Sequence, residues 1–179
     1  MSKETAIRRT AAGVAGCSLA LLVATAVVVA VPSLRDKVAG TSVPASYQKG
    51  QAVDLPSAFY KPSKYTLFVF SRANCAACQR SKLATAELIA ALRKQPGTQA
   101  FMVVAEGKAQ DELRFAADLG LDEAHVVQMD LSGLRVQHVP TFLLADDSGR
   151  IRYVVDGVLT EESRKAMVDA AAALPALAD

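Results

Sequence analysis

The sequence contains few of the residues that mark specialised small folds. Its 179 residues include three cysteines, two histidines and no tryptophan. Three cysteines are too few for a small domain held together by several disulfides. Glycine and proline together number 17, which excludes collagen-like and low-complexity chains. A formal net charge of +2 gives no reason to expect a nucleic-acid partner, and the length suits one folded domain with an additional segment.

What the sequence does have is an uneven distribution of charge and hydrophobicity. Residues 1–40 contain five basic and two acidic side chains, whereas residues 41–179 contain 15 basic and 16 acidic ones. No charged residue lies between Arg9 and Arg35, and residues 11–31 within this interval read AAGVAGCSLALLVATAVVVAV. A helix of about 20 apolar residues crosses the ~30 Å hydrocarbon layer of a membrane. We therefore predict that residues 11–31 form a transmembrane helix.

The basic residues before this segment predict its orientation. Lys3, Arg8 and Arg9 precede the apolar run, and basic flanking residues stay on the cytoplasmic side of a membrane. Residues 1–10 are then cytoplasmic, and the chain after the helix is exported. Two alternatives to an uncleaved anchor share this topology, namely a cleaved signal peptide and a lipoprotein modified at Cys17.

The remaining chain divides into a linker and a patterned region. Residues 32–62 contain four prolines and two glycines, which is typical of a linker. From residue 63 onwards, apolar runs alternate with helical patterns. The expected strands are residues 65–70, 100–105, 125–129, 141–145 and 151–155, and the expected helices are residues 75–94, 109–119 and 160–174.

This order of elements predicts the fold class. The two early strand–helix–strand crossovers require parallel pairing, whereas the turn at residues 146–149 joins an antiparallel hairpin. We predict an α/β fold with a mixed central sheet and helices on both faces, occupying residues 63–179.

Two cysteines lie where the first strand passes into the first helix. A spacing of three residues on a helix brings the sulfurs of Cys75 and Cys78 close enough to bond. The N-terminus of a helix favours a thiolate, and the thiolate is the attacking form in disulfide exchange. We therefore predict that Cys75 is a catalytic nucleophile and that Cys78 is the resolving thiol.

A structural or metal-binding role suits this cysteine pair less well. A purely structural disulfide closes a very small loop and stabilises little. Zinc takes four ligands, and His125 and His138 are too distant in sequence for a finger pattern. Copper needs Met or His ligands, but core packing explains Met102 and Met129 on their apolar strands. We expect no metal and no cofactor apart from a redox-active Cys75–Cys78 disulfide.

A second motif makes a resemblance specific. The strand, Cys75-x-x-Cys78 and helix are followed by Val139-Pro140-Thr141 before a hairpin, and residues 133–151 read GLRVQHVPTFLLADDSGRI. Over residues 64–174 this arrangement resembles the thioredoxin-like superfamily. It is most similar to the membrane-tethered, exported bacterial members that serve cytochrome c or methylamine dehydrogenase maturation. The resemblance implies a three-layer thioredoxin-like fold, with Pro140 as a cis-proline facing the cysteines.

The resemblance also implies a function. Val139, Pro140 and Thr141 would bind the extended chain of a substrate. The protein would be a thiol–disulfide oxidoreductase of the bacterial inner membrane, with its thioredoxin-like domain in the periplasm. It would reduce or exchange disulfides of exported proteins and could draw electrons from a membrane donor protein. The alternative is a non-catalytic binding or assembly module with a redox-sensitive disulfide.

The sequence departs from the family pattern around the cysteines. The dipeptide between them is Ala-Ala, Asn74 stands where many relatives carry tryptophan, and Val69 stands where many carry a buried carboxylate. These differences bear on the reduction potential and the direction of electron flow. Without that carboxylate, proton transfer to Cys78 would use water, Cys75 or a partner, with His138 as an alternative. We expect His125 to be structural.

Overall fold

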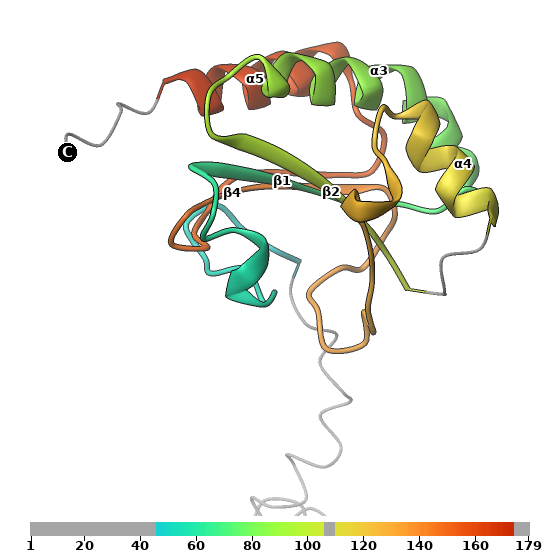
Figure 1. The fold of residues 1–179 in the computed structure, drawn as a ribbon, viewed down its shortest axis with the longest axis horizontal. Coiled ribbons are helices and arrows are strands. Elements are labelled where there is room, and N and C mark those ends of the chain that lie inside the picture. The colour runs from blue at the N-terminus through green and yellow to red at the C-terminus, as the bar shows by residue number, and fades with distance from the viewer. Residues whose placement is uncertain (1–45, 106–109, 174–179) are drawn as a thin grey trace, which may run out of the picture. The chain divides into compact units, whose positions relative to one another are not determined.

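The computed structural model describes residues 46–105 and 110–173 of the chain (Figure 1). The predicted transmembrane helix at residues 11–31 and Cys17 both lie outside the described residues. Within the described part of the chain, every helix is too short or too polar to span a bilayer.

The described residues form a five-stranded mixed sheet in the order β3-β2-β1-β4-β5. β1 pairs in parallel with β2, and β2 pairs in parallel with β3, whereas β4 is antiparallel to both β1 and β5. This confirms the mixed sheet expected from the sequence. The strands are β1 (Tyr65–Phe70), β2 (Thr98–Val104), β3 (Val126–Gln128), β4 (Thr141–Asp146) and β5 (Ile151–Asp156). The helices are α3 (Ala76–Arg93), α4 (Gln110–Asp118) and α5 (Glu161–Ala172), with short 3-10 helices at Ser57–Phe59 and Glu123–His125.

The register of the central strands fixes where the cysteines and the proline segment meet. All residues of β1 and β4 are buried, as expected for apolar strands covered on both faces. Phe70, at the end of β1, pairs with Val103 on one side and with Thr141, at the start of β4, on the other. The loop that leads from β1 to Cys75 therefore begins beside the residue that follows Pro140.

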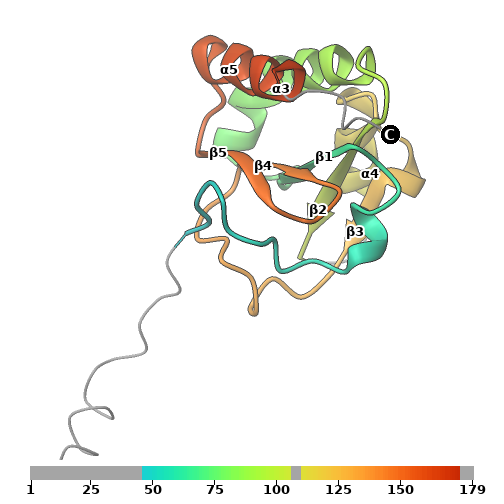
Figure 2. The same cartoon turned by 90° about the vertical axis from the view of Figure 1, so that its left-hand side faces the viewer.

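The three α-helices of the described residues pack on the same face of the sheet. Figure 1 shows α3, α4 and α5 together above the strands, and the turned view in Figure 2 shows α5 and α3 side by side there. Leu88 of α3, Phe115 of α4 and Met167 of α5 belong to one buried cluster with strand residues such as Leu67. The prediction of helices on both faces was thus wrong for the α-helices. The steps β1-α3-β2 and β2-α4-β3 run in one direction along the sheet, and right-handed crossovers then place both helices on one face.

Irregular segments cover the opposite face. Buried Tyr47, Val53 and Leu55 pack there with Phe68 and other strand residues, and the connection from β3 to β4 contributes partly buried side chains. Arg135, in the connection from β3 to β4, binds the N-terminal segment on this face. Its guanidinium lies 2.8 Å from the Asp54 carboxylate and 4.9 Å from the ring centre of Tyr47. From residue 46 onwards, the segment expected to be a linker is therefore part of the folded domain.

Candidate functional site

Cys75 occupies the N-cap position of α3, directly after the loop that leaves β1. Its Sγ accepts a hydrogen bond from the backbone N–H of Cys78 at 3.2 Å. Cys75 is partly exposed, whereas Cys78 is only 1% exposed, and both are free thiols in this structure. The sequence placed the pair correctly at the start of the helix. The geometry gives the two sulfurs unequal access to solvent.

The segment before β4 meets Cys75 from the other side. The peptide bond between Val139 and Pro140 is cis. The Cys75 thiol donates to the carbonyl oxygen of Val139 across 3.6 Å, although 64 residues separate them. The Gly157 N–H donates to the Pro140 carbonyl at 2.8 Å, which holds the proline segment against the end of β5. The cysteines and the Val139–Pro140 bond thus form one site.

Thr141 is buried beneath the site and supports it through hydrogen bonds of its hydroxyl. It is 1% exposed, and its hydroxyl lies 2.8 Å from the carbonyl oxygen of His138 and 2.9 Å from the carboxylate of Asp156. These contacts fix the backbone on both sides of Pro140. The side chain of Thr141 is therefore engaged within the protein, and the accessible part of the predicted binding segment is Val139 and the residue before it.

The surroundings of the two thiols shift their pKa values in opposite directions. Burial alone would raise the pKa of Cys75. Hydrogen bonds from the Cys78 thiol and from the N–H groups of Cys78 and Ala77, together with the charge of Arg72, outweigh burial and lower the pKa of Cys75. Burial raises the pKa of Cys78, and the neighbouring Cys75 raises it further. Cys75 is the better thiolate, while Cys78 holds its proton.

The two histidines have separate surroundings. His138 is exposed and directly precedes Val139, so it lies at the rim of the site. His125 contacts the carboxylate of Asp122 at 2.6 Å, and its ring centre lies 5.6 Å from that of Phe101. His125 therefore has local structural partners. In the described ranges, no three side chains of the metal-ligating types come together.

Sequence reasoning missed two residues that hold the loop before Cys75. The backbone N–H of Ala73 donates to both carboxylate oxygens of Glu112, each at 3.0 Å. The side-chain amide of Gln79 donates to the Ala73 carbonyl at 2.6 Å. Glu112 lies on α4, 39 residues beyond Ala73, so no local motif marks the contact. Gln79 follows Cys78 directly in the sequence, but the sequence does not show that its side chain turns back to bind the Ala73 carbonyl.

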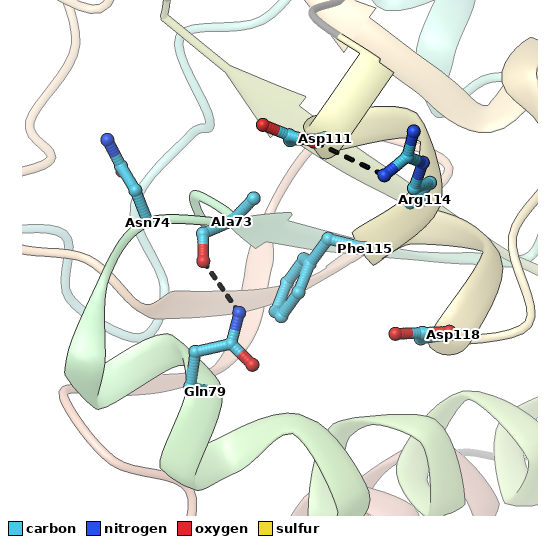
Figure 3. A pocket seen from close by; sticks show the side chains of 7 residues that line it. All are labelled: Ala73, Asn74, Gln79, Asp111, Arg114, Phe115 and Asp118. Atoms are coloured by element: carbon cyan, nitrogen blue, oxygen red, sulfur yellow. Dashed lines mark hydrogen bonds and ion pairs between the residues drawn. The ribbon is translucent and has the colours of Figure 1, made fainter.

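A cleft opens beside the same loop (Figure 3). It has a volume of about 300 Å³ and lies between the residues around Asn74 and the side of α4 that carries Asp111, Arg114, Phe115 and Asp118. Phe115 is 4% exposed and forms part of its lining, while the Asp111 carboxylate and the Arg114 guanidinium face each other across 3.8 Å at its edge. Asn74, which lines the cleft, immediately precedes Cys75 in the sequence, whereas Cys75 itself is not among the lining residues.

Comparisons with known proteins identify the fold. No protein-family model matches the chain, and a search of curated proteins gives no match. Among solved structures, a protein from Chlorobium tepidum described as a thiol:disulfide interchange protein DsbE aligns with a TM-score of 0.55 at 21% identity, covering 72% of this chain and 98% of its own. The thioredoxin domain of a thiol-disulfide oxidoreductase from Bacteroides vulgatus aligns with a TM-score of 0.52 at 18% identity, covering 69% and 97%.

A further match supports the same conclusion. A thioredoxin-like protein, solved in its oxidised form in solution, aligns with a TM-score of 0.53 at 15% identity, covering 73% of this chain and 95% of its own. These identities are low, so the likeness concerns the backbone arrangement. The chain has a thioredoxin-like α/β fold.

Proposed function

We propose that this protein is a thiol–disulfide oxidoreductase in which Cys75 attacks and Cys78 resolves. The observation that carries the proposal is the position of the Cys75 sulfur. It lies at a helix N-terminus, 3.2 Å from the Cys78 N–H and 3.6 Å from the Val139 carbonyl oxygen beside a cis-proline. The lowered pKa of Cys75 and the raised pKa of Cys78 match an attacking and a resolving thiol.

The reaction balances in two exchange steps. The Cys75 thiolate attacks one sulfur of a substrate disulfide, so that a mixed disulfide forms and the other substrate sulfur leaves as a thiolate. Cys78 then loses its proton to that thiolate and attacks the Sγ of Cys75. The Cys75–substrate bond breaks, and the second substrate thiolate takes a proton from water. The substrate gains two electrons and two protons overall, and the protein is left with a Cys75–Cys78 disulfide.

The backbone of Val139 is the proposed contact for the substrate chain. Its carbonyl oxygen already meets the Cys75 thiol, so a peptide lying along Val139 passes over the reacting sulfur. Pro140 has no N–H to compete for that peptide. Thr141 supports the segment through its buried hydroxyl.

We also propose that the domain acts outside the cytoplasm while tethered to the inner membrane by residues 11–31. The uncharged run after Lys3, Arg8 and Arg9 supports this placement. Disulfide substrates are exported proteins in such a compartment. A dithiol protein of the membrane would return the two electrons to the Cys75–Cys78 disulfide, and tethering would raise its effective concentration. The reducing direction is supported by the resemblance drawn from the sequence.

The decisive experiment traps the intermediate. The full-length Cys78→Ala variant cannot complete the second step, so covalent adducts with exported proteins should accumulate and disappear on treatment with dithiothreitol. The full-length Cys75→Ala variant is the matched control and should form none. Equal numbers of adducts in the two variants would refute the exchange mechanism. That result would favour the non-catalytic assembly module instead.

A further inference from the structure

The backbone N–H and the backbone carbonyl of Ala73, which belong to two successive peptide groups, are each bound by a side chain from a different helix. Glu112 of α4 accepts from its N–H through both carboxylate oxygens at 3.0 Å, and Gln79 of α3 donates to its carbonyl oxygen at 2.6 Å. Figure 3 shows the Gln79 side chain turned back toward Ala73. A carboxylate accepting from an N–H is a charge-assisted hydrogen bond, which is stronger than a neutral one. This pair of contacts holds the two peptide groups that adjoin Ala73, two residues before the proposed nucleophile.

The position of the Cys75 sulfur depends on this short stretch of backbone. Between Ala73 and Cys75 lies only Asn74, which is exposed, and the Cys75 N–H bonds back to the Arg72 carbonyl at 3.3 Å. In the structure the sulfur lies 3.2 Å from the Cys78 nitrogen on one side and 3.6 Å from the Val139 carbonyl oxygen on the other. Because only Asn74 separates Ala73 from Cys75, a rotation of either peptide group at Ala73 would shift the backbone that positions the Cys75 sulfur.

We propose that Glu112 and Gln79 are positioning residues that hold the loop before Cys75 so that its sulfur stays aligned with the Cys78 N–H. The proposal rests on the proposed function in one respect, namely that Cys75 is the attacking thiol. Under this proposal α4 contributes no reacting atom, but it supplies Glu112, which holds the backbone that leads to Cys75.

Because Glu112 is charged, the direction in which its removal shifts the pKa of Cys75 distinguishes two roles for this residue. A carboxylate near a thiolate opposes ionisation of the thiol, so removal of the charge alone would make Cys75 a better thiolate. Loss of the grip on Ala73 would weaken the hydrogen bond from Cys78 to the sulfur and make Cys75 a poorer thiolate. The positioning role and a purely electrostatic role therefore predict opposite changes for the Glu112→Ala variant.

The test measures the ionisation of Cys75 directly. The full-length reduced protein is alkylated with iodoacetamide over a range of pH. The tryptic peptide of residues 73–80, which carries both cysteines, is then analysed by mass spectrometry with fragmentation. We expect Glu112→Ala and Gln79→Ala each to slow the alkylation of Cys75 at pH 7 by about threefold or more, because the thiolate is the reacting form. The Glu112→Gln variant keeps an acceptor oxygen for the Ala73 N–H and should alkylate at least as fast as the unmodified protein.

Two further measurements keep the result interpretable. Glu162→Ala is the matched control, because Glu162 is exposed on α5 and should leave the rate unchanged. The Gln79→Ala variant tests the same grip without changing the charge, and circular dichroism checks that each variant is folded. Unchanged or faster alkylation in both Glu112→Ala and Gln79→Ala would overturn the proposal. Alkylation needs no disulfide substrate, so this result is independent of the trapping experiment.

Discussion

The Ser81 hydroxyl, one turn beyond Cys78 on α3, accepts a hydrogen bond from the backbone N–H of Leu159 at 3.0 Å. Both residues are buried. Leu159 lies in the turn between β5 and α5, two residues after Gly157, which holds the Pro140 carbonyl. The helix that carries the cysteines is therefore joined, through this turn, to the segment that faces them.

Ser81→Ala should destabilise the protein because it leaves the buried N–H of Leu159 without its partner. A buried polar group that loses its hydrogen bond costs about 1–3 kcal/mol. Urea unfolding monitored by circular dichroism measures the change. Ser132→Ala is the control, since Ser132 is exposed and its hydrogen bonds go to its near neighbour Asp130. Equal losses in the two variants would contradict the role assigned to Ser81.

The lowered pKa of Cys75 predicts selective alkylation of the reduced protein. Since Cys75 ionises more readily than an ordinary thiol and Cys78 is buried with a raised pKa, iodoacetamide should modify Cys75 first. The rate should rise with pH around a midpoint below that of a cysteine in an unstructured peptide measured alongside. Arg72→Gln should move this midpoint upward, since it removes a nearby positive charge. The difference should shrink at high salt because Arg72 is exposed.

A control and a contrary result follow from the same charge argument. Lys49→Gln removes an exposed positive charge from the segment that precedes the first strand and should leave the midpoint in place. If Cys78 reacts before Cys75, the unequal division of protons between the two thiols is wrong.

Two leucines on α3 offer a matched comparison of core and surface. Leu88 is 0% exposed beneath the helix, whereas Leu83 is 72% exposed. Leu88→Ala should lower the free energy of unfolding by about 2–5 kcal/mol, since it removes buried methyl groups and leaves a cavity. Leu83→Ala should change it by about 0.5 kcal/mol or less. Chemical denaturation of both variants tests the face of α3 that meets the sheet, and similar losses would contradict it.

Arg135 should govern the packing of the segment around residues 51–54. Its guanidinium contacts the Asp54 carboxylate, the Gln51 side chain and the Ala52 carbonyl. Arg135→Ala should speed hydrogen exchange in this segment severalfold while lowering global stability by only about 1 kcal/mol, since the ion pair is partly exposed. Arg114→Ala, which breaks an exposed ion pair on α4, should leave hydrogen exchange in residues 51–54 unchanged. Faster exchange throughout the sheet would instead show that Arg135 supports the whole core.

Much of the fold was predictable because local patterns marked the elements. The apolar run at Tyr65–Phe70 is β1 with the expected bounds, and the turn before Gly149 joins an antiparallel pair as expected. The face on which the helices pack was not predictable, since it depends on which way each crossover steps along the sheet. The packing of residues 46–62 was also missed, because Tyr47, Val53 and Leu55 are too widely spaced to form a periodic pattern.

The site was predictable only in part. Cys75, Cys78 and the proline motif are recognisable in the sequence because their spacing and order carry the signal. The partners of the Ala73 N–H and carbonyl were not, since Glu112 comes from a helix that packs nearby only in the folded chain. Val69, at the position where the resemblance to the thioredoxin-like superfamily implies a carboxylate, is 1% exposed in the same buried cluster as Cys78, so an apolar side chain fills this part of the core.

The burial of Cys78 sets the direction from which each sulfur can approach. In the proposed reaction, three sulfur atoms must come nearly into line during each exchange. An incoming disulfide can reach Cys75 only from solvent, while Cys78, at 1% exposure, can approach it only from the protein interior. The departing sulfur of the second step is therefore the outermost of the three, and the product leaves along the path by which the substrate arrived.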